Sequence, residues 1–218
     1  MTTPLRPAWL AVAIALAAAA CEPTTPFRAC VGCTYDFADT LPPDILVFHW
    51  PGAQQPVRFY ADPRGAMPAL VASGIATWEA QFLYGELRGT VVSDSGQADV
   101  LVLWSGIVPA DVAPDPGPPV PACSGVTTFP SWVFGSAPGR ALHVALNPLG
   151  GFSDAQVAAC LQRVSIHELG HALGLLKHSP SPFDIMYQTP TVTLPSNADR
   201  WTAQILYHTT PTVVPPPR

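Results

Sequence analysis

The chain has 218 residues, which is enough for one domain with appended segments and a substantial hydrophobic core. Only 11% of the residues are charged, and the formal net charge is −5. Domains that bind nucleic acid carry basic patches or stripes, so this composition argues against a nucleic-acid partner.

Residues 1–20 have the pattern of a secretory signal peptide, with Arg6 in the positive region before an apolar run over residues 9–20. The run ends in Ala18-Ala19-Ala20-Cys21, which resembles a bacterial lipobox, where the cysteine is lipidated and becomes the new N-terminus. Ordinary cleavage near the same residues, giving a soluble secreted protein, is the alternative. We therefore expect an extracytoplasmic protein, either secreted or anchored to the bacterial cell envelope by a lipid on Cys21.

The cysteine content fits the same location. The chain has five Cys, and lipidation of Cys21 would leave an even set: Cys30, Cys33, Cys123 and Cys160. An even set is typical of disulfides formed in an oxidising compartment. The pairing among these residues stays open, because sequence alone does not decide it.

Proline marks the domain boundaries. The chain has 27 Pro, many of them in the first fifty residues, in a loop at about 105–122 and at the C-terminus. Proline-rich segments cannot continue helices or central strands. We therefore expect a linker at 21–51, one domain at 52–209 and a tail at 210–218.

Short apolar runs predict the strands of this domain. The five expected strands cover residues 57–60, 91–92, 100–104, 123–129 and 141–146.

Apolar spacing and capping residues predict the helices. A helix from Pro68 to about Arg88 would have Trp78 in the core of the domain rather than as a ligand-stacking residue. Ser153 begins a capping box that starts a second helix, which we expect to run to Gly174. Ser196 is expected to cap a last helix.

The stretch from His167 to His178 carries the strongest functional signal. His167 and His171 are four residues apart, so on a helix they lie on the same face. Two imidazoles in this arrangement can bind one zinc ion, and Glu168 beside the first can act as general base toward an attacking water. Gly174 would end the helix and allow the chain to return, with His178 as a third ligand. Three protein ligands and one open position are typical of a catalytic zinc site.

The third ligand has several candidates. No Glu follows Glu168, and the only later carboxylates are Asp184 and Asp199. Lys177 is a poor zinc ligand, because its amine must lose a proton with a pKa near ~10.4. We therefore expect His178 to be the ligand, with Asp184 or a defective site as the alternatives.

The motif resembles the metzincin signature H-E-x-x-H-x-x-G-x-x-H, with one residue inserted. Lys177 stands where the third His is expected, and His178 follows it. His178-Ser179 and the later pair Met186-Tyr187 are similar to the matrixin branch of the metzincins. By this resemblance, Met186 is the Met-turn residue, which lies beneath the metal without ligating it.

The resemblance implies an α+β fold of the metzincin type: a twisted mixed sheet of about five strands, a long helix, an active-site helix and a C-terminal helix. The edge strand would be Gly125 to Phe129, where an extended substrate pairs, and Tyr187 to Pro195 would wall the pocket beside the metal. Calcium sites, common in the family, are possible, but no acidic loop has a clear ligand spacing.

The expected function is that of a monomeric zinc metalloendopeptidase, which hydrolyses protein or peptide substrates with one catalytic Zn²⁺ and Glu168 as general base. Two alternatives stay open. One is a zinc amidase acting on cell-wall peptides, and the other is a non-catalytic binding lipoprotein on a decayed peptidase scaffold. The remaining histidines, His49, His143 and His208, lack partners at ligand spacing and are not expected to bind metal.

Overall fold

The structure is a computed structural model that describes residues 33–41, 44–105, 122–135, 137 and 139–218. The signal peptide, Cys21, Cys30 and most of the expected proline-rich loop lie outside these residues. Among the described residues, none of the helices combines the length and hydrophobicity that a membrane span requires.

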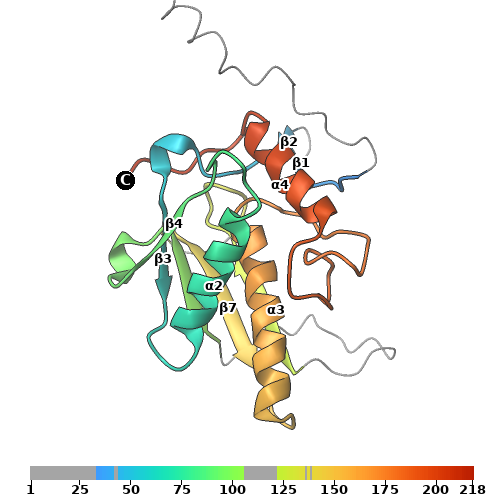
Figure 1. Cartoon of the computed structure of the whole chain (residues 1–218). Coiled ribbons are helices and arrows are strands. Elements are labelled where there is room, and N and C mark those ends of the chain that lie inside the picture. Colours follow the sequence, from blue (N-terminus) through green and yellow to red (C-terminus); the bar gives the residue numbers. More distant parts are fainter. Residues whose placement is uncertain (1–32, 42–43, 106–121, 136, 138) are drawn as a thin grey trace, which may run out of the picture. The chain divides into compact units, whose positions relative to one another are not determined.

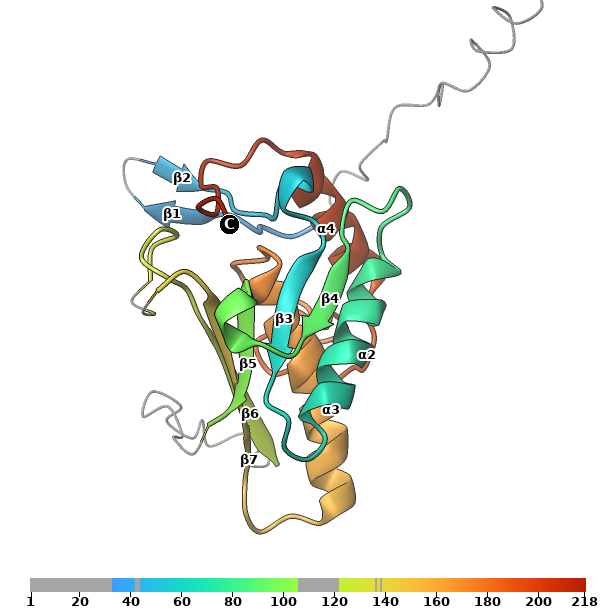
Figure 2. The same ribbon diagram turned by 90° about the vertical axis from the view of Figure 1, so that its left-hand side faces the viewer.

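All five predicted strands are present and form one mixed sheet (Figure 2). Their order across the sheet is β4 (Gly89–Val92), β3 (Val57–Ala61), β5 (Val100–Trp104), β7 (Leu142–Pro148) and β6 (Cys123–Thr128). The first four run parallel to their neighbours, and β6 is antiparallel to β7. Strand β6 is therefore an edge strand, in the region expected from the sequence. A separate pair, β1 (Asp39–Leu41) and β2 (Asp44–Leu46), is antiparallel.

Two long helices cover one face of the sheet (Figures 1 and 2). Helix α2 (Met67–Glu79) packs over β3, β4 and β5, while α3 (Asp154–Ala172) packs over β6 and β7 and against α2. Helix α4 (Asn197–His208) closes the fold, and the short 3-10 helices η2 (Gly52–Gln54) and η3 (Ser95–Gln97) connect strands. The α+β architecture of the sequence analysis is confirmed.

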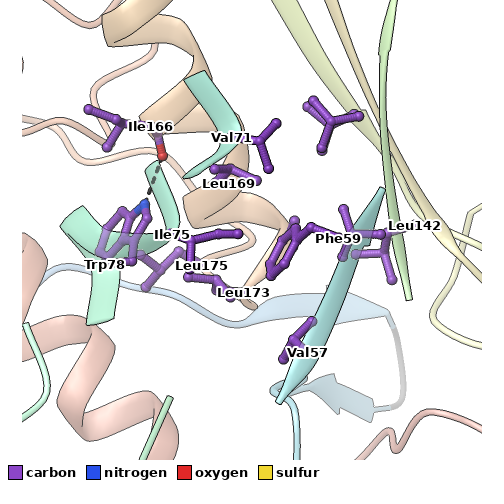
Figure 3. Packing of buried hydrophobic residues seen from close by; sticks show 14 of the residues in the cluster. Val57, Phe59, Val71, Ile75, Trp78, Leu142, Ile166, Leu169, Leu173 and Leu175 are labelled. Carbon is purple, nitrogen blue, oxygen red and sulfur yellow. Dashed lines mark hydrogen bonds between the residues drawn. The ribbon is translucent and has the colours of Figure 1, made fainter. Parts of the chain in front are cut away.

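The core lies between the two helices and the sheet (Figure 3). Trp78 of α2 is fully buried there, and its indole N–H donates to the carbonyl of Ile166 in α3 at 2.8 Å. Phe59 of the sheet and Leu169 of α3 fill the space beside it. Trp78 is thus a core residue, as predicted, and it fixes the helix that carries the histidines.

Helix α2 ends at Glu79, earlier than predicted. Phe82 keeps the buried position that the apolar spacing suggested, but it does so from a turn, where its ring contacts Tyr207. The Glu79 carboxylate accepts the N–H of Gly89 at 2.7 Å, so the end of the helix is joined to the start of β4. The chain must reverse within a few residues to pair β4 with β3, and the apolar pattern continues through that reversal.

The packed region extends beyond the predicted boundaries at 52 and 209. Phe48 and Trp50, which the sequence analysis assigns to the linker, are buried in the core, and the Trp50 indole donates to the carbonyl of Ala172 at 2.9 Å. In the predicted tail, Val213 pairs with Phe48, and Arg218 forms an ion pair with Asp99. The high proline content concealed these contacts, because apolar side chains can pack from extended backbone as well as from helices and strands.

Candidate metal centre

Helix α3 begins where the capping box predicts. The backbone N–H of Ser153 donates to the Gln156 side chain at 2.9 Å, and the Ser153 hydroxyl accepts the N–H of Gln156. These reciprocal bonds satisfy N–H groups that have no partner within the helix. The first turn of the active-site helix is therefore fixed locally.

The end of α3 depends on Gly174. The N–H of Gly174 donates to the carbonyl of His171 at 3.0 Å, and the N–H of Leu175 donates to that of Gly170 at 3.1 Å, which is the Schellman pattern. Gly174 has a φ of +114°, and a Cβ there would collide with the carbonyl oxygen of Phe48. Only glycine fits this turn, which reverses the chain toward His178 as predicted.

The structure brings His167, His171 and His178 together. The Nε2 atom of His171 lies 3.1 Å from Nε2 of His167 and 3.3 Å from Nε2 of His178. One ring nitrogen from each residue falls within 4.8 Å of the other two. Zinc–imidazole bonds of about 2.0–2.1 Å in a tetrahedron would separate ligand nitrogens by about 3.3 Å.

The protonation of the rings fits a metal ion. Nδ1 of His167 lies 2.8 Å from the carbonyl oxygen of Ile185, and Nδ1 of His171 lies 2.5 Å from that of Leu175. A carbonyl only accepts, so both Nδ1 atoms carry the proton and both Nε2 atoms present lone pairs. Burial lowers the pKa of His167 to about 4 and also lowers the pKa of His171 and His178, so the rings are neutral. Converging lone pairs with no proton between them suit a shared cation.

The inserted Lys177 takes no part in this cluster. Its ammonium group forms ion pairs with Asp36 at 3.5 Å and Asp39 at 3.9 Å, in the segment that precedes the sheet. The residue before it, Leu176, donates its N–H to the carbonyl of Phe37. The extra residue is thus absorbed by contacts with the N-terminal segment, and His178 reaches the other histidines.

Met186, the predicted Met-turn residue, packs against the helix that carries His167 and His171. It is fully buried, and a Cβ on Gly170 would collide with its sulfur, so the thioether lies against α3. Its carbonyl accepts the N–H of Ser179 at 2.8 Å, which closes the loop that begins after His178. Asp184, the alternative ligand, accepts the Ser179 hydroxyl and lies outside the histidine cluster.

Comparison with known families agrees with this geometry. The sequence model described as Matrixin matches residues 79–208, which is more than half of the chain. The chain belongs to the matrixin family. Matrixins are zinc metallopeptidases, and the match covers both the histidine cluster and Met186. Among proteins of curated function, the comparison finds no match.

In this matrixin, a carboxylate that the sequence analysis did not single out for this role supports the turn at Met186. Asp199 is completely buried and accepts the N–H groups of Ile185 at 2.8 Å, Met186 at 3.3 Å and Ser196 at 2.8 Å. It also accepts the hydroxyl of Tyr35 at 2.7 Å. The pattern Ser196-x-x-Asp199 was visible as a helix cap, but capping carboxylates usually face solvent, so nothing in the pattern indicated this second role.

Glu168 faces β6 from the helix. Its Oε2 atom lies 2.7 Å from the Thr127 hydroxyl, and a Cβ on Gly125 would approach its side chain to 2.6 Å. Burial raises the pKa of Glu168 to about 7, and the hydrogen bond from Thr127 acts in the opposite direction. Thr127 was also missed from the sequence, because a strand threonine at an edge carries no distinguishing pattern.

The other histidines lie outside this cluster in the described part of the chain. Nε2 of His49 lies 2.9 Å from the carbonyl oxygen of Thr209, and Nδ1 of His208 lies 2.7 Å from that of Gln204. Neither these two nor His143 belongs to the cluster found among the described residues.

A cavity of about 680 Å³ adjoins His167 and Glu168. One wall is the segment Gln188–Thr191, within the stretch that the sequence analysis expected there. The cavity is also lined by α3 and by the start of β6, which the disulfide Cys123–Cys160 joins together. The sequence analysis left the pairing of four cysteines open, and this disulfide settles it for Cys123 and Cys160. Cys33 is also disulfide-bonded.

Proposed function

We propose that this matrixin is a zinc metalloendopeptidase in which His167, His171 and His178 hold one catalytic zinc ion and Glu168 is the general base. The observation that carries the proposal is the convergence of three neutral imidazole nitrogens beside a buried carboxylate. Zinc, when bound, supplies a Lewis acid that polarises the scissile carbonyl and makes water a better nucleophile.

The histidines are arranged to hold the metal with little reorganisation. The carbonyls of Ile185 and Leu175 fix the rings of His167 and His171 in the tautomer that leaves Nε2 free. Because burial keeps both rings neutral, binding a cation near pH 7 releases no proton from them. Three protein ligands leave a position for water or substrate.

Glu168 is suited to proton transfer. A pKa of about 7 lets the carboxylate take a proton from an attacking water and then deliver it to the leaving amine at neutral pH. The Thr127 hydroxyl holds Oε2, which leaves Oε1 as the oxygen without this restraint. The fixed carboxylate thus serves as both base and acid.

The free edge of β6 supports an extended peptide as substrate. Among the described residues, β6 pairs only with β7, so its other side presents backbone groups that a peptide can pair with as an added strand. Strand pairing of this kind recognises the backbone groups along a peptide and does not require its charged terminus. It therefore favours cleavage within a peptide over removal of terminal residues.

Zinc content and casein cleavage test the proposal on the full chain. We expect about one zinc per protein and cleavage for wild type and Lys177→Ala, zinc without cleavage for Glu168→Gln, and neither for His178→Ala. A zinc-free, inactive wild type would instead support a decayed scaffold. A zinc-loaded wild type that cleaves only cell-wall peptides would support the amidase.

We also propose that the protein works outside the cytoplasm. The buried Cys123–Cys160 disulfide supports an oxidising compartment, and the residues before Cys21 have the composition of a lipoprotein signal. Palmitate labelling of the full chain in a bacterial host, lost in Cys21→Ser, would establish the anchor. Unlabelled protein in the medium would indicate simple secretion.

A further inference from the structure

We infer that Arg163 makes the cavity beside Glu168 selective for an acidic side chain, so that the favoured peptides carry Asp or Glu at a position next to the scissile bond. This inference rests on the proposed peptidase function and concerns which substrates the same site takes.

Helix geometry places Arg163 beside the reacting groups. Gln156, Cys160, Arg163 and His167 recur at intervals of three or four residues along α3, and all four line the cavity. Arg163 precedes His167 by about one turn, which corresponds to about 6 Å along the helix axis. A substrate side chain that enters the cavity next to the scissile bond therefore passes within reach of the guanidinium.

Among the described residues that line the cavity, Arg163 is the only one with a permanent positive charge. The other polar lining residues, besides His167 and Glu168, are uncharged: Ser124, Gln156, Gln188, Thr189 and Thr191. The segment 187–195, which supplies the lining residues Gln188–Thr191, also contains no Lys or Arg.

Within the described part of the chain, the side chain of Arg163 has no hydrogen bond or ion pair. The guanidinium groups of Arg58, Arg140 and Arg218, by contrast, all bind Asp99. A guanidinium presents its N–H donors in a fork that matches a carboxylate. Arg163 is half-buried, and it lines the same cavity as the apolar residues Phe152 and Val164, so a charge pair there is stronger than in open solvent.

The inference predicts discrimination by charge. An acidic side chain would form a charge-assisted pair with Arg163, a neutral amide of the same shape would not, and a basic side chain would be repelled. A hydrogen bond to a charged group is worth about 1.5–3 kcal/mol, which corresponds to about a ten- to hundredfold preference for Glu over Gln.

The first experiment measures binding without turnover. Zinc-loaded Glu168→Gln full-length protein is titrated with fluorescent hexapeptide pools that carry Glu, Gln or Lys at one fixed position and random residues elsewhere. Both termini are blocked, so that no terminal carboxylate is present. At one position we expect the Glu pool to bind about tenfold more tightly than the Gln pool, and we expect Arg163→Gln to abolish the difference. Arg88→Gln, which removes the same charge from an exposed site outside the cavity, serves as the matched control.

The second experiment measures cleavage by wild type, Arg163→Gln and Arg163→Glu on a blocked peptide library, with cleavage sites mapped by mass spectrometry. We expect Asp and Glu to be enriched at one position for wild type, no charge preference for Arg163→Gln, and Lys or Arg enrichment for Arg163→Glu. Equal binding of all pools, or an acidic preference that survives Arg163→Gln, would overturn the inference. An acidic preference in binding without any cleavage would overturn the proposed peptidase function alone.

Discussion

The carboxylate of Asp199 accepts the backbone N–H of Met186, and so joins the first turn of α4 to the turn beneath the histidine cluster. The same carboxylate binds the N–H of Ile185, whose carbonyl fixes the ring of His167. A single buried side chain therefore connects the closing helix with a candidate zinc ligand. The position of the histidine site therefore depends on α4 as well as on α3.

Asp199→Asn should destabilise the fold and weaken zinc binding. Oδ2 accepts the N–H groups of Ile185 and Ser196, while Oδ1 accepts from Met186 and Tyr35. In the Asp199→Asn variant, one of these two oxygens becomes an NH₂ group. In either orientation of the amide, this NH₂ group faces two hydrogen-bond donors, which it cannot accept. We expect a loss of about 2–4 kcal/mol in the free energy of unfolding and a zinc affinity about tenfold lower.

Urea unfolding and zinc competition titrations measure these two effects. Tyr35→Phe, which removes one donor and leaves the carboxylate intact, is the control and should cost about 1 kcal/mol. If Asp199→Asn unfolds and binds zinc as wild type does, the link between α4 and the Met-turn has no energetic weight.

Asp99 should make stability depend on pH at the acid end. Its fully buried carboxylate forms ion pairs with Arg58, Arg140 and Arg218. Burial raises its pKa, but the bonds from Arg58 and Arg218 outweigh burial, so the folded pKa lies below the usual value. The stabilisation is therefore fully present above the unfolded pKa of about 3.9 and is lost as the pH falls through the lower folded value.

Asp99→Asn should cost about 3 kcal/mol at pH 7, because three guanidinium groups lose their shared partner. The difference in unfolding free energy between wild type and Asp99→Asn should then shrink as the pH is lowered from neutral into the acid range. Urea titrations of both proteins at several pH values give this difference directly. The other carboxylates contribute equally to the pH dependence of the two proteins, so their contributions cancel in the difference. If the difference stays constant down to acid pH, the ionised Asp99 carboxylate and its arginine pairs are not the source of the stabilisation.

Thr127 should matter for catalysis more than for metal binding. Thr127→Val preserves the shape of the side chain and removes the hydroxyl that holds Oε2 of Glu168. We expect kcat on a peptide substrate to fall about tenfold, since a hydrogen bond to a charged group is worth about 1.5–3 kcal/mol, while zinc content stays unchanged.

Thr128→Val is the matched control for this change. Successive residues of a strand point to opposite faces, so Thr128 lies on the other side of β6 and should tolerate the substitution. Equal rates for Thr127→Val and wild type would show that Glu168 is positioned without the hydroxyl.

The sequence predicted the local features of this molecule well, because each had a short-range cause. The capping box at Ser153, the turn at Gly174 and the strand over Val100–Trp104 all follow from a few neighbouring residues, and the structure has each of them. The histidine cluster belongs to the same group, since helix periodicity and one reversal bring its members together.

Features that depend on distant parts of the chain escaped prediction. Trp50 reaches the core from a proline-rich segment, and Asp199 binds backbone groups more than ten residues away. Arg163 has an ordinary helical position, and only the tertiary arrangement of β6 and the segment after Met186 makes it part of a cavity. Such relationships require the fold, because no pattern of neighbouring residues encodes them.

The disulfide Cys123–Cys160 should stabilise both the fold and the cavity. It joins the start of β6 to α3 across a sequence separation of 37 residues, and both sulfurs lie in the wall beside Glu168. A crosslink of this span restricts the unfolded chain and is worth about 2–4 kcal/mol. The double variant Cys123→Ala with Cys160→Ala, which leaves Cys33 untouched, should lose about that much in urea unfolding.

The same variant should separate substrate binding from metal binding. The bonds that hold the rings of His167 and His171, and the bond from Ser179 to Met186 in the loop after His178, do not involve β6, so the zinc content should match wild type. Without the crosslink, the start of β6 can move away from α3, and we expect KM for peptides to rise severalfold while kcat changes little. Loss of zinc from the double variant would mean that the disulfide also supports the metal site, because α3 itself would then depend on the crosslink.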